Sequence, residues 1–133
     1  MSKKFVLATV AAFVLLAGFG YLIHGVLLDP EYAQLPNLMR TADESAKHLP
    51  YIMLAQLLAA VSLVWIYEKG RNETPWMGQG IRFGIAAAIF APAVKFITYY
   101  AVQPEPHTIA LHQILGEGFA MVIVCVVVAR IYK

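Results

Sequence analysis

The chain has 133 residues, of which 60% are hydrophobic and only 14% are charged. Soluble domains are nearer half apolar and a quarter charged, so this composition argues against a water-soluble domain and favours lipid as the solvent. The formal charge of +2 is too small to indicate a nucleic-acid partner. The single cysteine, Cys125, excludes an internal disulfide and a four-cysteine zinc site, and we expect it to act as a small apolar residue.

Four apolar runs are long enough to cross a membrane as helices, at about residues 5–28, 51–67, 81–102 and 109–131. A spanning helix needs about 20 such residues. A transmembrane barrel would need strands of about 10 residues with alternating polarity, which these runs lack. We therefore predict an all-α membrane protein with a single domain, residues 1–133, built as an up-down bundle of four transmembrane helices.

The first run follows Met1-Ser2-Lys3-Lys4, a start that also resembles a signal peptide. Signal sequences have an apolar core of about 7–15 residues and a cleavage site flanked by small residues. This run is longer and no such site follows it, so we expect an uncleaved first span.

Prolines mark where the predicted spans begin, end and bend. Pro50 suits a helix start, because the N–H that proline lacks would be unpaired there. Pro92 lies inside the third run and should kink it. The prolines between the runs are expected to act as stops: Pro30, Pro75, Pro104 and Pro106. The long connection, residues 29–49, is predicted to be an outer loop with a short surface helix within 37–48.

Charged residues divide unequally between the two ends of the predicted bundle. If the N-terminus is inside, the inner side holds seven cations: Lys3, Lys4, Lys69, Arg71, Arg82, Arg130 and Lys133. The outer loops then hold two cations, Arg40 and Lys47, and five carboxylates: Asp29, Glu31, Asp43, Glu44 and Glu105. Lys and Arg concentrate on the cytoplasmic side of membrane proteins, so both termini are predicted to be cytoplasmic.

Short similar sequences occur at equivalent places in the two halves of the chain. The first span ends in LLDPE and the third in AVQPE, while the second ends in WIYEKG and the fourth in RIYK. Both hairpins would begin on the same side, so any repeat would be a parallel one. The same residues are also favoured at helix ends, so duplication and coincidence both stay open.

Lys95 and Glu117 lie deep enough in the predicted spans to need partners. Counting about 1.5 Å per residue from the outer ends places them about 10 and 12 Å deep, where an unpaired charge costs about 3 kcal/mol. Two helices joined by the short loop QPEPHT must be neighbours, so the two side chains can pair. An intramembrane polar site is predicted from these residues and others at similar depth: Lys95, Glu117, Gln56, Gln113 and Tyr99. It is either an ion pair that fixes helix register, a proton- or substrate-binding site, or a contact with another subunit.

Small residues on the third span predict close helix packing. Gly80, Gly84 and Ala88 repeat every four residues, an arrangement that lets two helices approach closely. The same stripe, continued through Ala91 to Lys95 and Tyr99, would turn Lys95 toward a neighbouring helix. The ladder is expected to pack within the bundle, with dimerisation as the alternative.

All four histidines fall on the predicted outer side: His24, His48, His107 and His112. Helical rise places His24 and His112 about 6 and 5 Å deep, so we expect His24 to look across at the fourth helix near His112. That arrangement would suit a haem or a metal ion, although no HExxH, CxxC or CxxCH motif accompanies it. The simpler interpretation is that the histidines close the polar top of the bundle, with no cofactor; a proton relay is a third.

Several stretches together resemble a family of small bacterial four-span membrane proteins: LIHGVLLDPEY, WIYEKG, GQGIRFG, YYAVQPEP and ARIYK. The resemblance covers most of the chain. It implies a compact four-helix protein of the bacterial inner membrane and transfers no catalytic residue, because the family carries no assigned activity.

Three functions follow from these patterns. The first is a non-enzymatic membrane protein, a structural or accessory subunit of a membrane complex, whose partners are the bilayer and other subunits or a second copy. The second is a small proton-coupled transporter that uses Lys95 and Glu117. The third is a redox protein that holds haem or a metal through His24 and His112. No hydrolase constellation or phosphate-binding glycine loop is present.

Overall fold

The computed structural model describes residues 1–133 as an entirely helical chain without strands. Its elements in chain order are α1 (Lys3–Gly20), the π-helical η1 (Tyr21–Leu27), α2 (Asp29–Tyr32), α3 (Ala42–Lys47), α4 (Leu49–Gly70), α5 (Trp76–Ala88), the π-helical η2 (Ile89–Ala93), α6 (Val94–Val102) and α7 (His107–Tyr132). Four stretches are long and apolar enough to cross a membrane: Lys3–Leu27, Leu49–Gly70, Trp76–Val102 and His107–Tyr132. The prediction of four helices long and apolar enough to span a membrane is confirmed. The largest difference in bounds is the start of the third, at Trp76 rather than 81, because two glycines and Gln79 interrupt the apolar run in its first turns.

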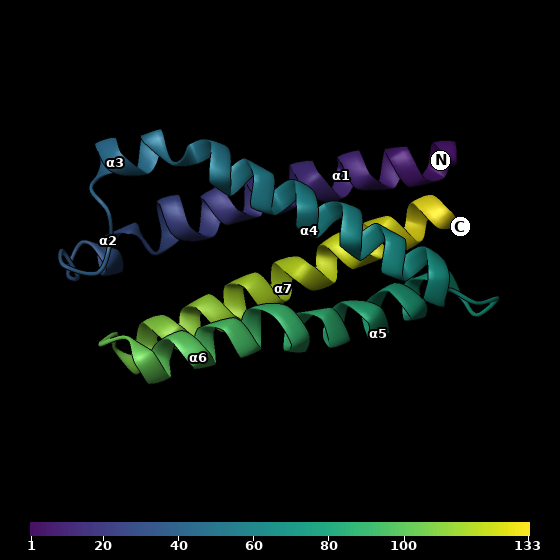
Figure 1. Ribbon diagram of the computed structural model, residues 1–133. Coiled ribbons are helices and arrows are strands. Elements are labelled where there is room, and N and C mark those ends of the chain that lie inside the picture. Colours follow the sequence, from purple (N-terminus) through teal and green to yellow (C-terminus); the bar gives the residue numbers. More distant parts are fainter.

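Successive spans run in opposite directions, so both termini lie at one end of the bundle, here called the terminal end (Figure 1). The other end, which carries α2 and α3, is called the distal end. α7 is the central helix and packs against both α5 and α1, while α4 packs mainly on α1 and makes little contact with α5 or α6. The core therefore follows α7, and α4 lies at the edge of the bundle.

Small side chains allow the close helix contacts. Ala8, Ala12 and Ala60 are fully buried where α1 meets α4 and α7. On α5, a Cβ atom at Gly80 would lie 2.8 Å from the Cβ of Ala129, and one at Gly84 would lie 2.7 Å from the Cα of Val122. The prediction that the small-residue ladder packs within the bundle is therefore confirmed.

The third span changes phase at η2. Pro92 lies inside this segment, and a π turn accommodates a residue that has no N–H to donate. From η2 onward the buried positions are Pro92 and Phe96, whereas Ala91 and Tyr99 are exposed. The predicted stripe is therefore wrong beyond Ala88, because the wider π turn rotates the rest of the helix relative to a regular α-helix.

The connection between the first two spans is more ordered than a loop. Pro30 does not end the helical path as predicted but occupies the first turn of α2, which follows the buried Leu28. α3 begins with a capping box in which Thr41 Oγ1 accepts from the Glu44 N–H and the Glu44 carboxylate accepts from the Thr41 N–H. The short helix expected within 37–48 is thus present at Ala42–Lys47.

Candidate functional site

Three ionisable side chains from three different spans meet in the distal half of the bundle. His24 Nε2, in η1, lies 2.5 Å from Oε1 of Glu117 on α7. Lys95 Nζ, on α6, donates to Oε2 of the same carboxylate at 3.0 Å. The Lys95–Glu117 pair expected from the sequence is present, and His24 joins it as a third member.

Tyr32 and Gln113 extend this group, and we call the five residues the polar cluster. His24 Nδ1 lies 2.5 Å from the Tyr32 hydroxyl, and Gln113 Nε2 donates to that hydroxyl at 3.1 Å. Because the hydroxyl accepts from Gln113, its own hydrogen is available to donate to His24 Nδ1. His24 Nε2 then carries the ring hydrogen and donates it to Glu117. This tautomer satisfies all of the hydrogen bonds, with the imidazole as a bridge between a phenol and a carboxylate.

Aromatic rings cover the cluster. The Tyr32 and Phe96 rings lie 5.9 and 6.0 Å from the His24 ring, and the Tyr32 ring is nearly parallel to it. Lys95 Nζ lies 4.2 Å from the centre of the Phe96 ring, within range of a cation–π interaction. The side chains of His24, Glu117 and Lys95 are 30%, 23% and 42% exposed. The carboxylate is therefore the most enclosed of the three, where electrostatic interactions are stronger than in bulk water.

The two π-helical segments position the basic members of the cluster. His24 lies inside η1, where the Leu28 N–H bonds to the Ile23 carbonyl in the wider π pattern. Lys95 follows η2 by two residues. π turns inside α-helices occur frequently at functional sites, and here each re-aims a side chain toward Glu117.

A second histidine–carboxylate contact lies nearer the distal end. His112 Nδ1 on α7 is 2.8 Å from Oε1 of Glu31 on α2. His24 and His112 therefore take different carboxylate partners instead of facing each other as predicted. Both ring nitrogens of His24 are already engaged, so a haem or metal shared with His112 would require His24 to leave Tyr32 or Glu117.

The relative depths predicted for His24 and Glu117 are wrong, because the ends of the first and fourth spans are staggered. α2, directly after the first span, contacts His112 and Gln113, the latter six residues into α7. Six residues of helix correspond to about 9 Å, so the first span ends well below the start of α7. His24 consequently lies level with Glu117, although counting from helix ends separated them.

Two residues of the predicted site lie elsewhere. Gln56, on α4, has its Nε2 within 3.6 Å of a Cβ position at Gly20 and makes no hydrogen bond to the cluster. Tyr99 is exposed and packs against the edge of the Phe96 ring, because the π turn moved Phe96 into the buried position. Gln113 is the remaining polar residue of the prediction that belongs to the cluster.

Tyr32 was missed by sequence reasoning because it follows Asp29-Pro30, which looked like the end of a helix. Its place after an acidic, proline-containing turn gave no sign that the chain folds back over α7. Burial raises the pKa of Tyr32 most, the nearby carboxylates raise it further, and the Gln113 hydrogen bond opposes them. The phenol is therefore held in its protonated form, as its role as a donor to His24 requires.

Two buried oxygen atoms near this end have no hydrogen-bond partner: Oε1 of Glu105 and Oε1 of Gln113. Burial raises the pKa of Glu105, which lies in the short connection between α6 and α7. Buried polar atoms are usually paired, so each of these two oxygens is an acceptor that can still take a hydrogen bond.

The arrangement suits proton chemistry better than ligation of a metal ion. No group of three or more His, Cys, Asp or Glu side chains is placed to hold a metal ion. The imidazole and the carboxylate, by contrast, share one hydrogen at short distance, and a phenol and an ammonium group bond to their other sides.

No family model matches this sequence, and neither curated proteins nor solved structures yield a match. The function must therefore be inferred from the chain's own residues.

Proposed function

We propose that this chain is a small, non-enzymatic integral membrane protein that binds and releases a proton at the polar cluster, as a small proton-coupled transporter would. The observation that carries the proposal is the convergence of His24, Lys95 and Glu117 from three separate spans onto one carboxylate. Ionisable residues inside a membrane are costly and commonly mark ion pathways or proton relays.

The hydrogen bonds of the cluster can rearrange when the cluster takes up a proton. A proton added at His24 Nδ1 would reverse the link to Tyr32, because the ring would then donate to the hydroxyl. The displaced Tyr32 hydrogen needs an acceptor, and rotation of the Gln113 amide offers Oε1, which has no partner in the present state. The cluster can thus take up a proton without losing a link in the chain.

The test is a comparison of wild-type protein with Glu117→Gln in liposomes that contain a pH-sensitive dye. Under an imposed pH gradient and a potassium diffusion potential, we expect proton flux in the wild type. Glu117→Gln should reduce it to the level of protein-free liposomes, because the only carboxylate of the cluster is lost. Glu31→Gln is the matched control, since Glu31 pairs with His112 outside the cluster and should retain flux.

Wild-type flux no greater than that of empty liposomes would count against the proposal. So would a Glu117→Gln protein that keeps its flux and only melts at lower temperature. In that case the three-way contact is an ion pair that fixes helix register.

The location and orientation belong to the same proposal. Seven of the Lys and Arg residues lie at the terminal end and two lie in the distal connections. This bias favours a cytoplasmic terminal end, and the resemblance to small bacterial four-span proteins favours the bacterial inner membrane. The cluster would then lie nearer the outer face.

A parallel repeat of the two hairpins stays a prediction. Tyr67 and Tyr132 occupy equivalent places in the similar sequences WIYEKG and RIYK, and their ring centroids lie 5.7 Å apart. Against a repeat, α4 does not pack on α5 as α7 packs on α1.

A second candidate function is an accessory subunit of a membrane complex, which the position of α4 favours. This helix packs mainly on α1, and its free side exposes Leu54, Leu58 and Trp65 to lipid or to another subunit. Copurification in a mild detergent checks this candidate. A free monomer without a stable partner would contradict it.

A redox protein that holds haem or a metal between His24 and His112 is favoured less, because the two residues pair with different carboxylates. An absorbance spectrum of the purified protein checks it. The absence of a Soret band and of stoichiometric metal would remove it.

A further inference from the structure

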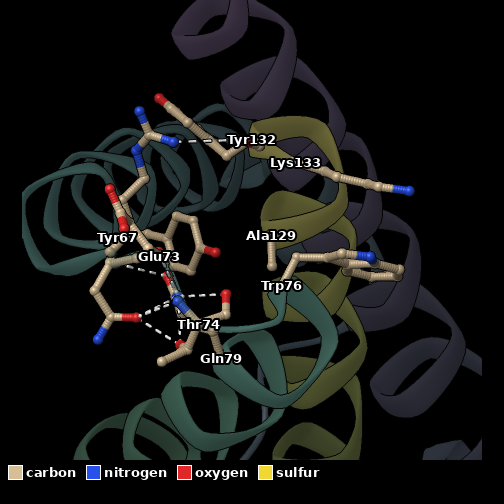
Figure 2. A pocket seen from close by; sticks show the side chains of 10 residues that line it. Tyr67, Glu73, Thr74, Trp76, Gln79, Ala129, Tyr132 and Lys133 are labelled. Carbon is tan, nitrogen blue, oxygen red and sulfur yellow. Dashed lines mark hydrogen bonds between the residues drawn. The ribbon is translucent and has the colours of Figure 1, made fainter.

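A pocket of about 230 Å³ opens at the terminal end between α4, α5 and α7, far along the bundle from the polar cluster (Figure 2). Arg71 lines it with positive charge, and Tyr67 and Tyr132 line it with aromatic rings. Lys133 and Trp76 also border it, but their side chains extend away from it (Figure 2). We call it the basic pocket. It lies where three membrane-spanning helices end, which is the level of lipid headgroups.

Arg71 has no carboxylate partner in the protein. All three ion pairs of the protein lie in its distal half, and no carboxylate comes within 4.0 Å of Arg71 or Lys133. The guanidinium of Arg71 lies 5.1 Å from the centre of the Tyr132 ring. It donates one hydrogen bond, from Nη1 to the Tyr132 carbonyl. Its other N–H groups are free to meet a ligand. Glu73 also lines the pocket without neutralising Arg71, so its charge should oppose an anion.

Hydrogen bonds fix the loop that forms one wall of the pocket. Gln79 Nε2 donates to the Asn72 carbonyl, to Asn72 Oδ1 and to Thr74 Oγ1, at 3.0, 2.9 and 3.0 Å (Figure 2). Arg82 adds a bond to the same Thr74 hydroxyl. A wall that is already ordered lowers the entropic cost of binding.

The size and the chemistry of the pocket indicate its ligand. Sites for drug-sized molecules occupy roughly 300–1,000 Å³, so this smaller space suits a fragment such as a headgroup. Arginine recognises phosphate through parallel N–H groups, and Trp and Tyr are enriched at headgroup level. We propose that the basic pocket binds a phosphate group, supplied by the headgroup of an anionic phospholipid. This proposal does not depend on proton exchange at the polar cluster.

The two tryptophans, Trp65 and Trp76, allow a direct test. In a Trp65→Phe background, Trp76 fluorescence reports on the pocket wall while phosphatidylglycerol is titrated into neutral detergent micelles. We expect a saturable change that phosphatidylcholine does not produce. Arg71→Gln should weaken the apparent affinity about fivefold, the effect of one cation at a membrane surface. Lys69→Gln removes a cation that does not line the pocket and should leave the affinity unchanged.

Glu73→Gln supplies a test of opposite sign, because removing the anion should tighten phosphatidylglycerol binding. Equal responses of the Arg71 and Lys69 variants would overturn the proposal, as would equal responses to the two lipids. Saturation by inorganic phosphate alone at the same concentrations would overturn the lipid source and assign the phosphate site to a soluble anion.

Discussion

Lys95, Glu117, His24 and Tyr32 meet in the distal half of the bundle. The pairing of Lys95 with Glu117 was predictable from the sequence, because a short loop forces their helices to be neighbours. The contribution of His24 was not, because its level depends on the stagger of helices that are not consecutive in the chain. The contribution of Tyr32 was not predictable either, because Tyr32 follows Asp29-Pro30, a sequence typical of a helix end. Sequence periodicity places a residue on a face of its own helix, but it contains no information about the relative heights of two helices.

Glu105 should make the stability of the folded state depend on pH. Its carboxyl is buried, one oxygen has no partner, and burial raises its pKa. The folded state therefore holds the proton more tightly than the unfolded state, so stability is full below the ordinary carboxyl pKa and is lost as pH rises through the raised value. The melting temperature of the wild type should therefore fall as the pH rises through the acid range. Glu105→Gln should remove this fall, measured by circular dichroism in detergent.

Asp43→Asn is the control for that experiment, because Asp43 is exposed on α3 and its substitution should leave the wild-type pH profile unchanged. If Glu105→Gln and the wild type decline in parallel, the pH dependence originates in another group.

At the scale of the elements, hydropathy was sufficient to place four spans but not their internal phase. Length and apolarity determine that a segment crosses a membrane as a helix. Pro92 correctly signalled a break in the third span, yet whether a helix responds with a kink or a π turn depends on its neighbours. η1 contains no proline, so no comparable signal marks the π turn of the first span. The resulting changes of phase put Phe96, rather than Tyr99, beside the cluster.

The contact between α5 and α7 leaves no space for a side chain at Gly84. A Cβ at Gly84 would lie 2.7 Å from the Val122 Cα and 3.2 Å from the Cys125 Cβ, so Gly84→Ala must push the two helices apart. Overpacking of this kind typically costs about 1–3 kcal/mol. The free energy of unfolding, measured by denaturing-detergent titration, should fall by that amount. Reaction of a thiol reagent with Cys125, now fully buried, should also become faster.

Gly78→Ala is the matched control on the same helix, because no atom lies within 4 Å of the Cβ position there. It should be neutral or stabilise the helix by up to about 1 kcal/mol through better helix propensity. Equal losses of stability in both variants would show that the helix contact is not as close as described.

The whole molecule is electrically polarised along its axis. The terminal end carries seven cations against the carboxylates of Glu68 and Glu73, which leaves +5, while the distal connections carry five carboxylates against two cations, which leaves −3. Lys95 and Glu117 cancel within the span region, so these values add to the formal charge of +2. The ion pairs all lie in the distal half. At the terminal end, four cations instead contact carbonyl oxygens, a hydroxyl group or an aromatic ring: Lys4, Arg71, Arg82 and Arg130.

This polarity predicts which end faces the cytoplasm, because positively charged loops are retained on the cytoplasmic side during insertion. In a Cys125→Ala background, Lys47→Cys places a thiol on α3 at the distal end and Lys133→Cys places one at the terminal end. A membrane-impermeant maleimide should label Lys47→Cys in intact cells and Lys133→Cys only after the membrane is opened. The reverse pattern would put the termini outside and the polar cluster in the cytoplasmic half. Labelling of both thiols in intact cells would indicate that the protein inserts in both directions, as expected only if the charge bias were too weak to select one.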